Sequence, residues 1–168
     1  MESLNLTTNE DISAYYRGKI IQSAILLEFR MDIAIGRYFS SNQLQNILNT
    51  IGAFDNSISI GFHAKNLILQ YIIKKDFPDF LKTRSTFFSD IDKLMSTRNI
   101  VAHKRPDYNQ KDYAVLSWSK TSKNSVGNKV FNINKSIVDD YTKLADKVGV
   151  MILDLELLIS LKAKADKY

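Results

Sequence analysis

Apolar side chains recur every three or four residues along most of the chain, which is the spacing of amphipathic helices. The first run ends near Ser40 and has these predicted inward positions: Ile21, Ala24, Ile25, Glu28, Met31, Asp32 and Ile35. Before it, Thr8 with Asp11, or Thr7 with Glu10, matches the capping box that begins a helix. We therefore predict one long first helix.

The same reasoning predicts three more helices between residues 42 and 103. A short one covers residues 42–52, a loop follows at 53–59, and a third helix covers about 61–75. Pro78 interrupts the pattern because its ring does not fit a helix interior. The fourth helix is predicted from residue 80 to 101 or 103. The inward positions of the last two are Phe62, Leu69, Ile72, Ile73, Phe80, Phe87, Ile91, Leu94, Met95 and Val101.

The pattern changes after Pro106, which prevents the fourth helix from continuing much further. Segments 113–119 and 129–134 are rich in β-branched and aromatic residues. A stretch rich in Ser, Asn, Gly and Lys separates them. We therefore predict a β-hairpin with a long tip.

A last helix is predicted from about Lys135 to Lys164, with Asn134 or Ser136 as its cap. Its apolar stripe consists of Leu144, Val148, Met151, Ile152, Leu155, Leu158 and Ile159. The predicted fold class is all-α, an antiparallel bundle of four or five helices with a small β-hairpin before the last helix. Residues 1–168 are predicted to form a single domain.

The composition excludes several kinds of site. The chain has no cysteine, so disulfides and thiolate chemistry are excluded, and His63 and His103 lie too far apart for a zinc signature. The N-terminus MESLNLTTNEDIS does not resemble a signal peptide, and the apolar runs are too short to span a membrane. We expect a cytoplasmic protein without a metal or another cofactor.

Positive charge concentrates between residues 82 and 111. The chain has a net charge of +5, and this segment holds seven Lys or Arg residues against three Asp. A basic segment attracts a polyanion such as RNA, although a solvated basic face without a ligand fits the same pattern. We expect the RNA contacts of this segment to come from Lys93, Lys104 and Arg105.

Arg98, Asn99 and His103 lie in this segment, near the predicted end of the fourth helix. Asn99 and His103 share a helix face, whereas Arg98 and His103 are separated by roughly 140° around the axis. They can meet if the ring turns back at the helix end, or if a second copy of the chain supplies one of them. Arginine binds phosphate and histidine transfers protons near neutral pH, so the pair could cleave RNA and leave a 2′,3′-cyclic phosphate.

The stretch STRNIVAHK, residues 96–104, resembles the signature of the HEPN superfamily (higher eukaryotes and prokaryotes nucleotide-binding domains). That signature is an Arg, a polar residue that is commonly Asn, and a His after four to six residues. Phe62 and Lys65 are similar to residues that recur upstream of the motif in several HEPN families. Lys104 departs from the pattern, because many members have a small residue at that position.

The resemblance implies a helical bundle that forms a homodimer, in which Arg98 and His103 of the two copies build a composite cleft. Many HEPN proteins are metal-independent endoribonucleases of the toxin or phage-defence kind. In that role His103 would be the general acid and base, Arg98 the phosphate clamp and Asn99 the orienting residue. RNA would be the substrate, and an antitoxin or a regulatory protein a further partner.

Two other functions fit the same motif. Some HEPN proteins bind nucleic acid or protein without catalysis, as in the relatives of the mannitol-operon repressor type. A purely structural dimeric bundle is the third interpretation.

Glu28 is the expected supporting residue, because HEPN folds often place an acid of an early helix near the motif. We expect Glu28 to orient Arg98 or His103; an ion pair with a lysine would equally explain a carboxylate on the apolar side of its helix. His63 is expected to be structural or exposed, and Trp118 to be a packing anchor of the hairpin.

Overall fold

The computed structural model describes residues 8–40, 61–103, 105–107, 114–119 and 128–165. Its elements are α1 (Asn9–Phe39), α3 (Phe62–Asp76), α4 (Phe80–Thr83), α5 (Phe87–His103), β1 (Arg105–Asp107), β2 (Ala114–Ser119), β3 (Asn128–Ile133) and α6 (Lys135–Ala165). The predicted all-α bundle with a small hairpin before the last helix is confirmed. The predicted helix at 42–52 and the loop at 53–59 lie outside the described residues.

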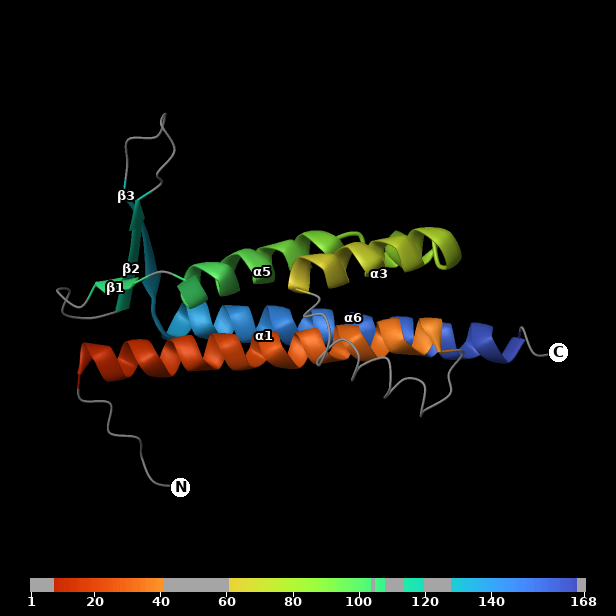
Figure 1. Cartoon of the computed structure of the whole chain (residues 1–168), viewed down its shortest axis with the longest axis horizontal. Coiled ribbons are helices and arrows are strands. Elements are labelled where there is room, and N and C mark those ends of the chain that lie inside the picture. Colours follow the sequence, from red (N-terminus) through yellow and green to blue (C-terminus); the bar gives the residue numbers. More distant parts are fainter. Residues whose placement is uncertain (1–7, 41–60, 104, 108–113, 120–127, 166–168) are drawn as a thin grey trace, which may run out of the picture.

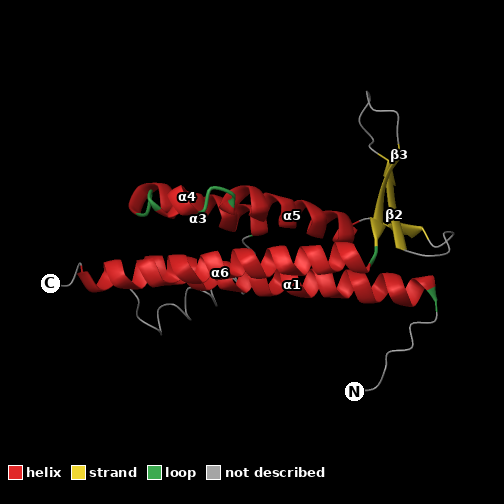
Figure 2. Ribbon diagram, turned by 180° about the vertical axis from the view of Figure 1, so that it is seen from behind, coloured by secondary structure: helices red, strands yellow, loops and turns green. Residues whose placement is uncertain are grey.

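The long helices form two layers (Figure 1). α1 and α6 lie side by side and run in the same direction, and α3 and α5 cover them. The parallel pairing of α1 and α6 includes an ion pair between Arg37 and Glu156 at 3.0 Å. α5 runs opposite to α6, because the chain turns back through the sheet at one end of the bundle (Figure 2). The predicted antiparallel packing is therefore met by α5, which runs opposite to its neighbours, whereas α1 and α6 are parallel to each other.

Short-range capping sets the ends of the longest helices. The Thr8 hydroxyl accepts a hydrogen bond from the Asp11 N–H at 3.1 Å, and the Thr8 N–H donates to the Asp11 carboxylate. This confirms the predicted capping box of Thr8 and Asp11. At α6 the cap is Asn134, whose Oδ1 accepts from the Ile137 N–H at 3.0 Å.

The prediction of one helix from residue 80 to 103 is wrong, because the chain leaves helical geometry at Arg84, where φ is −131° and ψ is 47°. The Arg84 guanidinium lies 2.5 Å from Asp154 of α6 and stacks over the Phe80 ring. The helix restarts at α5, where the Thr86 hydroxyl donates to the Asp90 carboxylate at 2.9 Å. The contact of Arg84 with Asp154, 70 residues away in the chain, thus favours the break between α4 and α5. A local sequence pattern cannot reveal such a contact.

The sheet has the order β1-β2-β3, and both neighbouring pairs are antiparallel. The β2–β3 pair confirms the predicted hairpin. β1 was not predicted, since it contains Pro106. Proline lacks an N–H for the ladder and is tolerated in an edge strand, which is the place of β1 in this sheet.

The core lies between the two layers and includes most of the predicted inward side chains. On α1 the prediction is wrong for Ile25, which is 58% exposed, while Ile20 and Leu27 are buried. A stripe with Ile25 and a stripe with Ile20 and Leu27 both satisfy a spacing of three and four. The neighbouring helices decide which of the two stripes is covered. Among the helices that the structure describes, none has the length and hydropathy of a membrane-spanning segment.

Candidate functional site

The motif residues lie on the last two turns of α5, which ends at His103. Arg98 is half-buried, whereas Asn99 and His103 are exposed. Their positions on a continuous helix place Arg98 and His103 on different sides of α5, roughly 140° apart. No hydrogen bond or ion pair joins the two within the part of the chain that the structure describes. The sequence expectation that the two do not share a face within one copy therefore holds.

Asn99 contacts Arg98: the Arg98 Nη1 donates to Asn99 Oδ1 at 3.2 Å. This contact joins one end of the guanidinium to an exposed side chain. Asn99 also shares an exposed polar stripe with His103, together with Asp92 and Ser96. Asn99 thus lies where it can affect both members of the motif.

Arg98 of α5 and Glu28 of α1 both lie near enough to Tyr141 of α6 for their charges to act on its phenol. Burial raises the pKa of the Tyr141 phenol well above its ordinary value of 10.0; the positive charge of Arg98 opposes this rise, and the negative charge of Glu28 adds to it. Tyr141 is only 5% exposed, and its hydroxyl has no hydrogen-bond partner among the described residues. The phenol therefore stays protonated at neutral pH, and its O–H can donate.

Glu28 lies 3.6 Å from the Nζ of Lys65, which is itself 2.7 Å from Asp32. Glu28 thus forms an ion pair with a lysine, which was the second of the two explanations that the sequence left open for this carboxylate. Within the described segments, Glu28 makes no hydrogen bond or ion pair to Arg98 or His103. Lys65, which the HEPN resemblance singled out, is buried between α1 and α3 and holds both acids.

Of the three predicted RNA-contacting residues, Lys93 alone is described with its side chain. Lys93 is exposed on α5 and lines a pocket beside α6. Lys104 lies outside the described residues, and Arg105 is described by its backbone alone, in β1. Trp118 is likewise described by its backbone alone, in β2.

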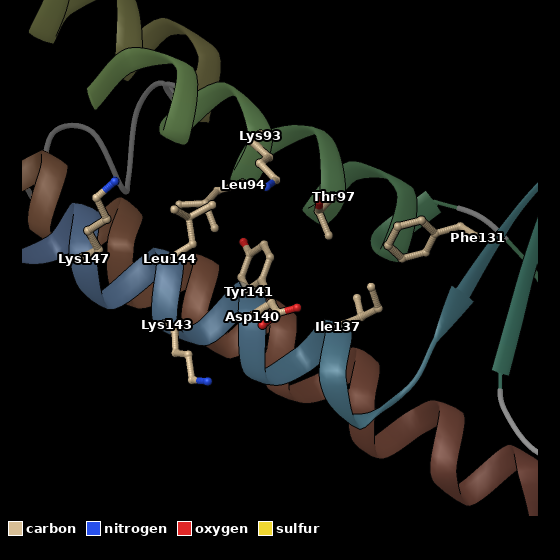
Figure 3. Close-up of a pocket in the computed structure, with 10 residues that line it drawn as sticks. All are labelled: Lys93, Leu94, Thr97, Phe131, Ile137, Asp140, Tyr141, Lys143, Leu144 and Lys147. Carbon is tan, nitrogen blue, oxygen red and sulfur yellow. The ribbon is translucent and has the colours of Figure 1, made fainter. Parts of the chain in front are cut away.

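A pocket of about 460 Å³ lies between α5, β3 and α6 (Figure 3). Its walls include Leu94, Phe131 and Leu144, and the Tyr141 ring rises into it from α6 with its hydroxyl directed toward α5. Thr97, the residue before Arg98, also lines it. The pocket therefore opens next to the motif.

Neither the pocket nor a role for Tyr141 was predicted from the sequence. Tyr141 occupies a position of the apolar stripe of α6, so that it reads as an ordinary core residue. The available signal was its hydroxyl, because a buried phenol needs a hydrogen-bond partner and the apolar stripe offers none.

Comparisons with protein-family models, curated proteins and solved structures found no match to this chain. The resemblance to HEPN proteins therefore rests on residues 96–104 with Phe62 and Lys65. Among the described residues, no three His, Cys, Asp or Glu side chains form a group that could hold a metal ion.

Proposed function

We propose that this chain is a cytoplasmic, metal-independent endoribonuclease of the toxin or phage-defence type that acts as a homodimer. The observation that supports the proposal is the placement of Arg98 and His103 on different sides of the same exposed helix end. One copy does not bring the two side chains together, so a second copy supplies the missing partner at a composite cleft.

The chemistry follows from the two side chains. His103 accepts the proton of a ribose 2′-OH, and the 2′-oxygen attacks the adjacent phosphorus. The bond to the 5′-oxygen of the next nucleotide breaks, and that oxygen takes a proton from the imidazolium of His103, which returns to its neutral form. Arg98 binds the phosphate as negative charge builds on its oxygens. The products are a 2′,3′-cyclic phosphate and a 5′-hydroxyl.

The first test is RNA cleavage by purified protein in excess EDTA, with the product ends identified. We expect the wild type to cleave, and His103→Ala and Arg98→Ala to lose about 100-fold or more of the rate. His63→Ala is the matched control, because His63 is also an exposed helical histidine, on α3. Asn99→Ala is expected to lose less, since Asn99 acts through its contact with Arg98.

Mixing the two inactive variants tests the composite cleft. A mixed dimer of Arg98→Ala and His103→Ala contains one site with both side chains if they come from different copies. Random mixing then restores about a quarter of the wild-type rate. Absence of any rescue, with dimers that do exchange, would show that each site uses a single copy.

A folded protein that cleaves no RNA would instead support the second candidate function, a HEPN-like module that binds nucleic acid or a protein partner, such as an antitoxin or a regulator, without catalysis. The contact between Arg98 and Asn99 fits that function as well, because it joins two polar side chains at the surface and requires no catalytic step. Equal expression of the wild-type and His103→Ala genes in cells would favour the same conclusion.

A further inference from the structure

Four large apolar side chains of α6 are exposed to solvent. They are each between 49% and 60% exposed, and we call them the outer stripe: Val150, Leu153, Leu157 and Leu161. The core-facing residues of the same turns lie on the opposite face of the helix and are buried: Val148, Ile152, Leu155 and Ile159. The second half of α6 therefore has two apolar faces, and the described parts of its own bundle cover only one of them. A helix that is apolar on both faces is typical of one that is covered on both.

The spacing of the outer stripe favours another helix as the covering element. Its members follow one another at three, four and four residues, so they form a continuous row on one face. Single exposed apolar residues are common on protein surfaces, whereas a continuous row marks an interaction site. A row with this spacing interlocks with a similar row on a facing helix, as in a coiled coil.

An acid and a base lie at the two ends of the outer stripe. Asp146 precedes the stripe by about one turn, and Lys164 follows it by about one turn. Both are exposed, and neither forms an ion pair within the described segments. Lys147 and Asp154, which flank the stripe, already pair with residues of the same copy. The two end charges are thus the ones that remain for a partner.

We infer that the outer stripe binds the outer stripe of a second copy of this chain, with the two α6 helices antiparallel. Leu153 of each copy then meets Leu157 of the other across a twofold axis. Asp146 lies seven residues before Leu153, and Lys164 lies seven residues after Leu157. The register that pairs the leucines therefore also pairs Asp146 of each copy with Lys164 of the other.

Charge complementarity selects this orientation. A parallel pairing would place Asp146 against Asp146 and Lys164 against Lys164, and like charges oppose such a contact. The antiparallel pairing makes two attractive contacts instead, one at each end of the stripe.

The size of the contact indicates its strength. The overlap from residue 146 to residue 164 is about 27 Å long, and a helix is about 10 Å wide. Leu26 of α1, which is 58% exposed, borders a small pocket together with Asp146 and adds apolar surface. This contact is smaller than a standard interface of about 800 Å² per partner, so we expect a micromolar dissociation constant.

The outer stripe is separate from the motif. α5 packs on another side of α6, toward which Tyr141 and Leu144 are directed (Figure 3). Pairing through α6 leaves the end of α5 accessible and needs no cleavage chemistry. The inference therefore goes beyond the proposed function, and a chain that pairs through both α5 and α6 forms assemblies larger than a dimer.

Exchanging the end charges tests the antiparallel register. The variants are made in a Ser96→Arg background, which opposes pairing through α5, and sedimentation measures the dissociation constant of the remaining association. Asp146→Lys and Lys164→Asp should each weaken it about five- to tenfold, because each creates two like-charge contacts. An equimolar mixture of the two variants should recover the original affinity, since every end contact then joins Lys to Asp. Asp139→Lys is the matched control, because Asp139 is exposed on α6 outside the overlap.

Leu157→Lys tests the apolar contact in the otherwise wild-type chain. A lysine at this exposed site should leave the fold intact, which circular dichroism checks, and it places two like charges near the twofold axis. The mass of the assembly should fall to half or less, whether the wild type is a dimer through α6 alone or a larger assembly through both surfaces.

The outcomes separate this inference from the proposed function. A lowered mass in Leu157→Lys, in a protein that cleaves no RNA, supports pairing through α6 and removes the nuclease. Cleavage by a protein whose mass and association are unchanged in Leu157→Lys and in both charge variants overturns pairing through α6 and leaves the nuclease. A Ser96→Arg protein that is monomeric at every micromolar concentration also overturns it, and the outer stripe would then be the surface for a different protein.

Discussion

Lys65 of α3 and Asp32 of α1 form an ion pair, with 2.7 Å between Nζ and Oδ2 and less than a tenth of either side chain exposed. Glu28, one turn before Asp32 on α1, lies 3.6 Å from the same ammonium group. One buried cation therefore links two acids of α1 to the helix that precedes the motif. Charges buried in this way are tolerated only while their partners are present.

Replacing Lys65 with Met should lower the free energy of unfolding by about 3–5 kcal/mol, because Asp32 and Glu28 lose their shared partner. The double variant Lys65→Met/Asp32→Leu should recover part of this loss. Urea denaturation measures both. Lys74→Met, at an exposed site on α3, is the control, and equal losses at the two lysines would contradict a structural role for the buried pair.

Replacing Gly18 with Ala should stabilise the protein by about 0.5–1 kcal/mol, because alanine is the better helix former. Gly18 lies inside α1, and a Cβ added there meets no atom within 4 Å. Gly149→Ala is the matched control in α6, because its Cβ would collide with the guanidinium of Arg30. Urea midpoints should rise for Gly18→Ala and rise less, or fall, for Gly149→Ala.

The stability contributed by Asp90 should depend on pH. Burial raises the pKa of its carboxyl, but hydrogen bonds from Lys147 and Thr86 outweigh this effect, and the pKa lies below its ordinary value of 3.8. A lowered pKa in the folded state means that the contribution is present above pH 3.8 and is lost as the pH falls through the folded value.

Asp90→Asn should therefore destabilise the protein at pH 7 by up to about 1 kcal/mol, since the partner Lys147 is half exposed. The difference from wild type should shrink in strongly acidic buffer. Denaturation at the two pH values measures it, with Asp139→Asn, at an exposed site on α6, as control. A difference that grows in acid would exclude this explanation.

The proposed dimer should pair through the exposed polar stripe of α5. A charge placed near a twofold axis meets its own copy, so Ser96→Arg should weaken dimerisation by about tenfold or more and reduce RNA cleavage in parallel. Leu157→Lys is the contrasting variant, because Leu157 is 60% exposed on α6 beside other exposed apolar residues. Light scattering reports the oligomeric state. Dissociation by Leu157→Lys alone would show that the copies pair through α6, away from the motif.

Several features of this protein follow from the sequence because their causes are local. The capping box of Thr8 and Asp11, the stop at Pro106 and the cap at Asn134 act on residues within one or two turns. The apolar stripes of α3 and α6 follow from the helical period alone. The position of the motif at the end of α5, and the separation of Arg98 from His103, follow from the same geometry.

Other features depend on which segments pack together, and only the tertiary structure decides them. The break before α5 coincides with the contact of Arg84 with Asp154, and the exposure of Ile25 depends on which neighbours cover α1. The partner of Glu28 is Lys65 because α3 lies beside α1. The pocket around Tyr141 exists because α5, β3 and α6 meet there. Each depends on contacts between residues far apart in the chain, and a periodic pattern records only which residues share a face of their own helix.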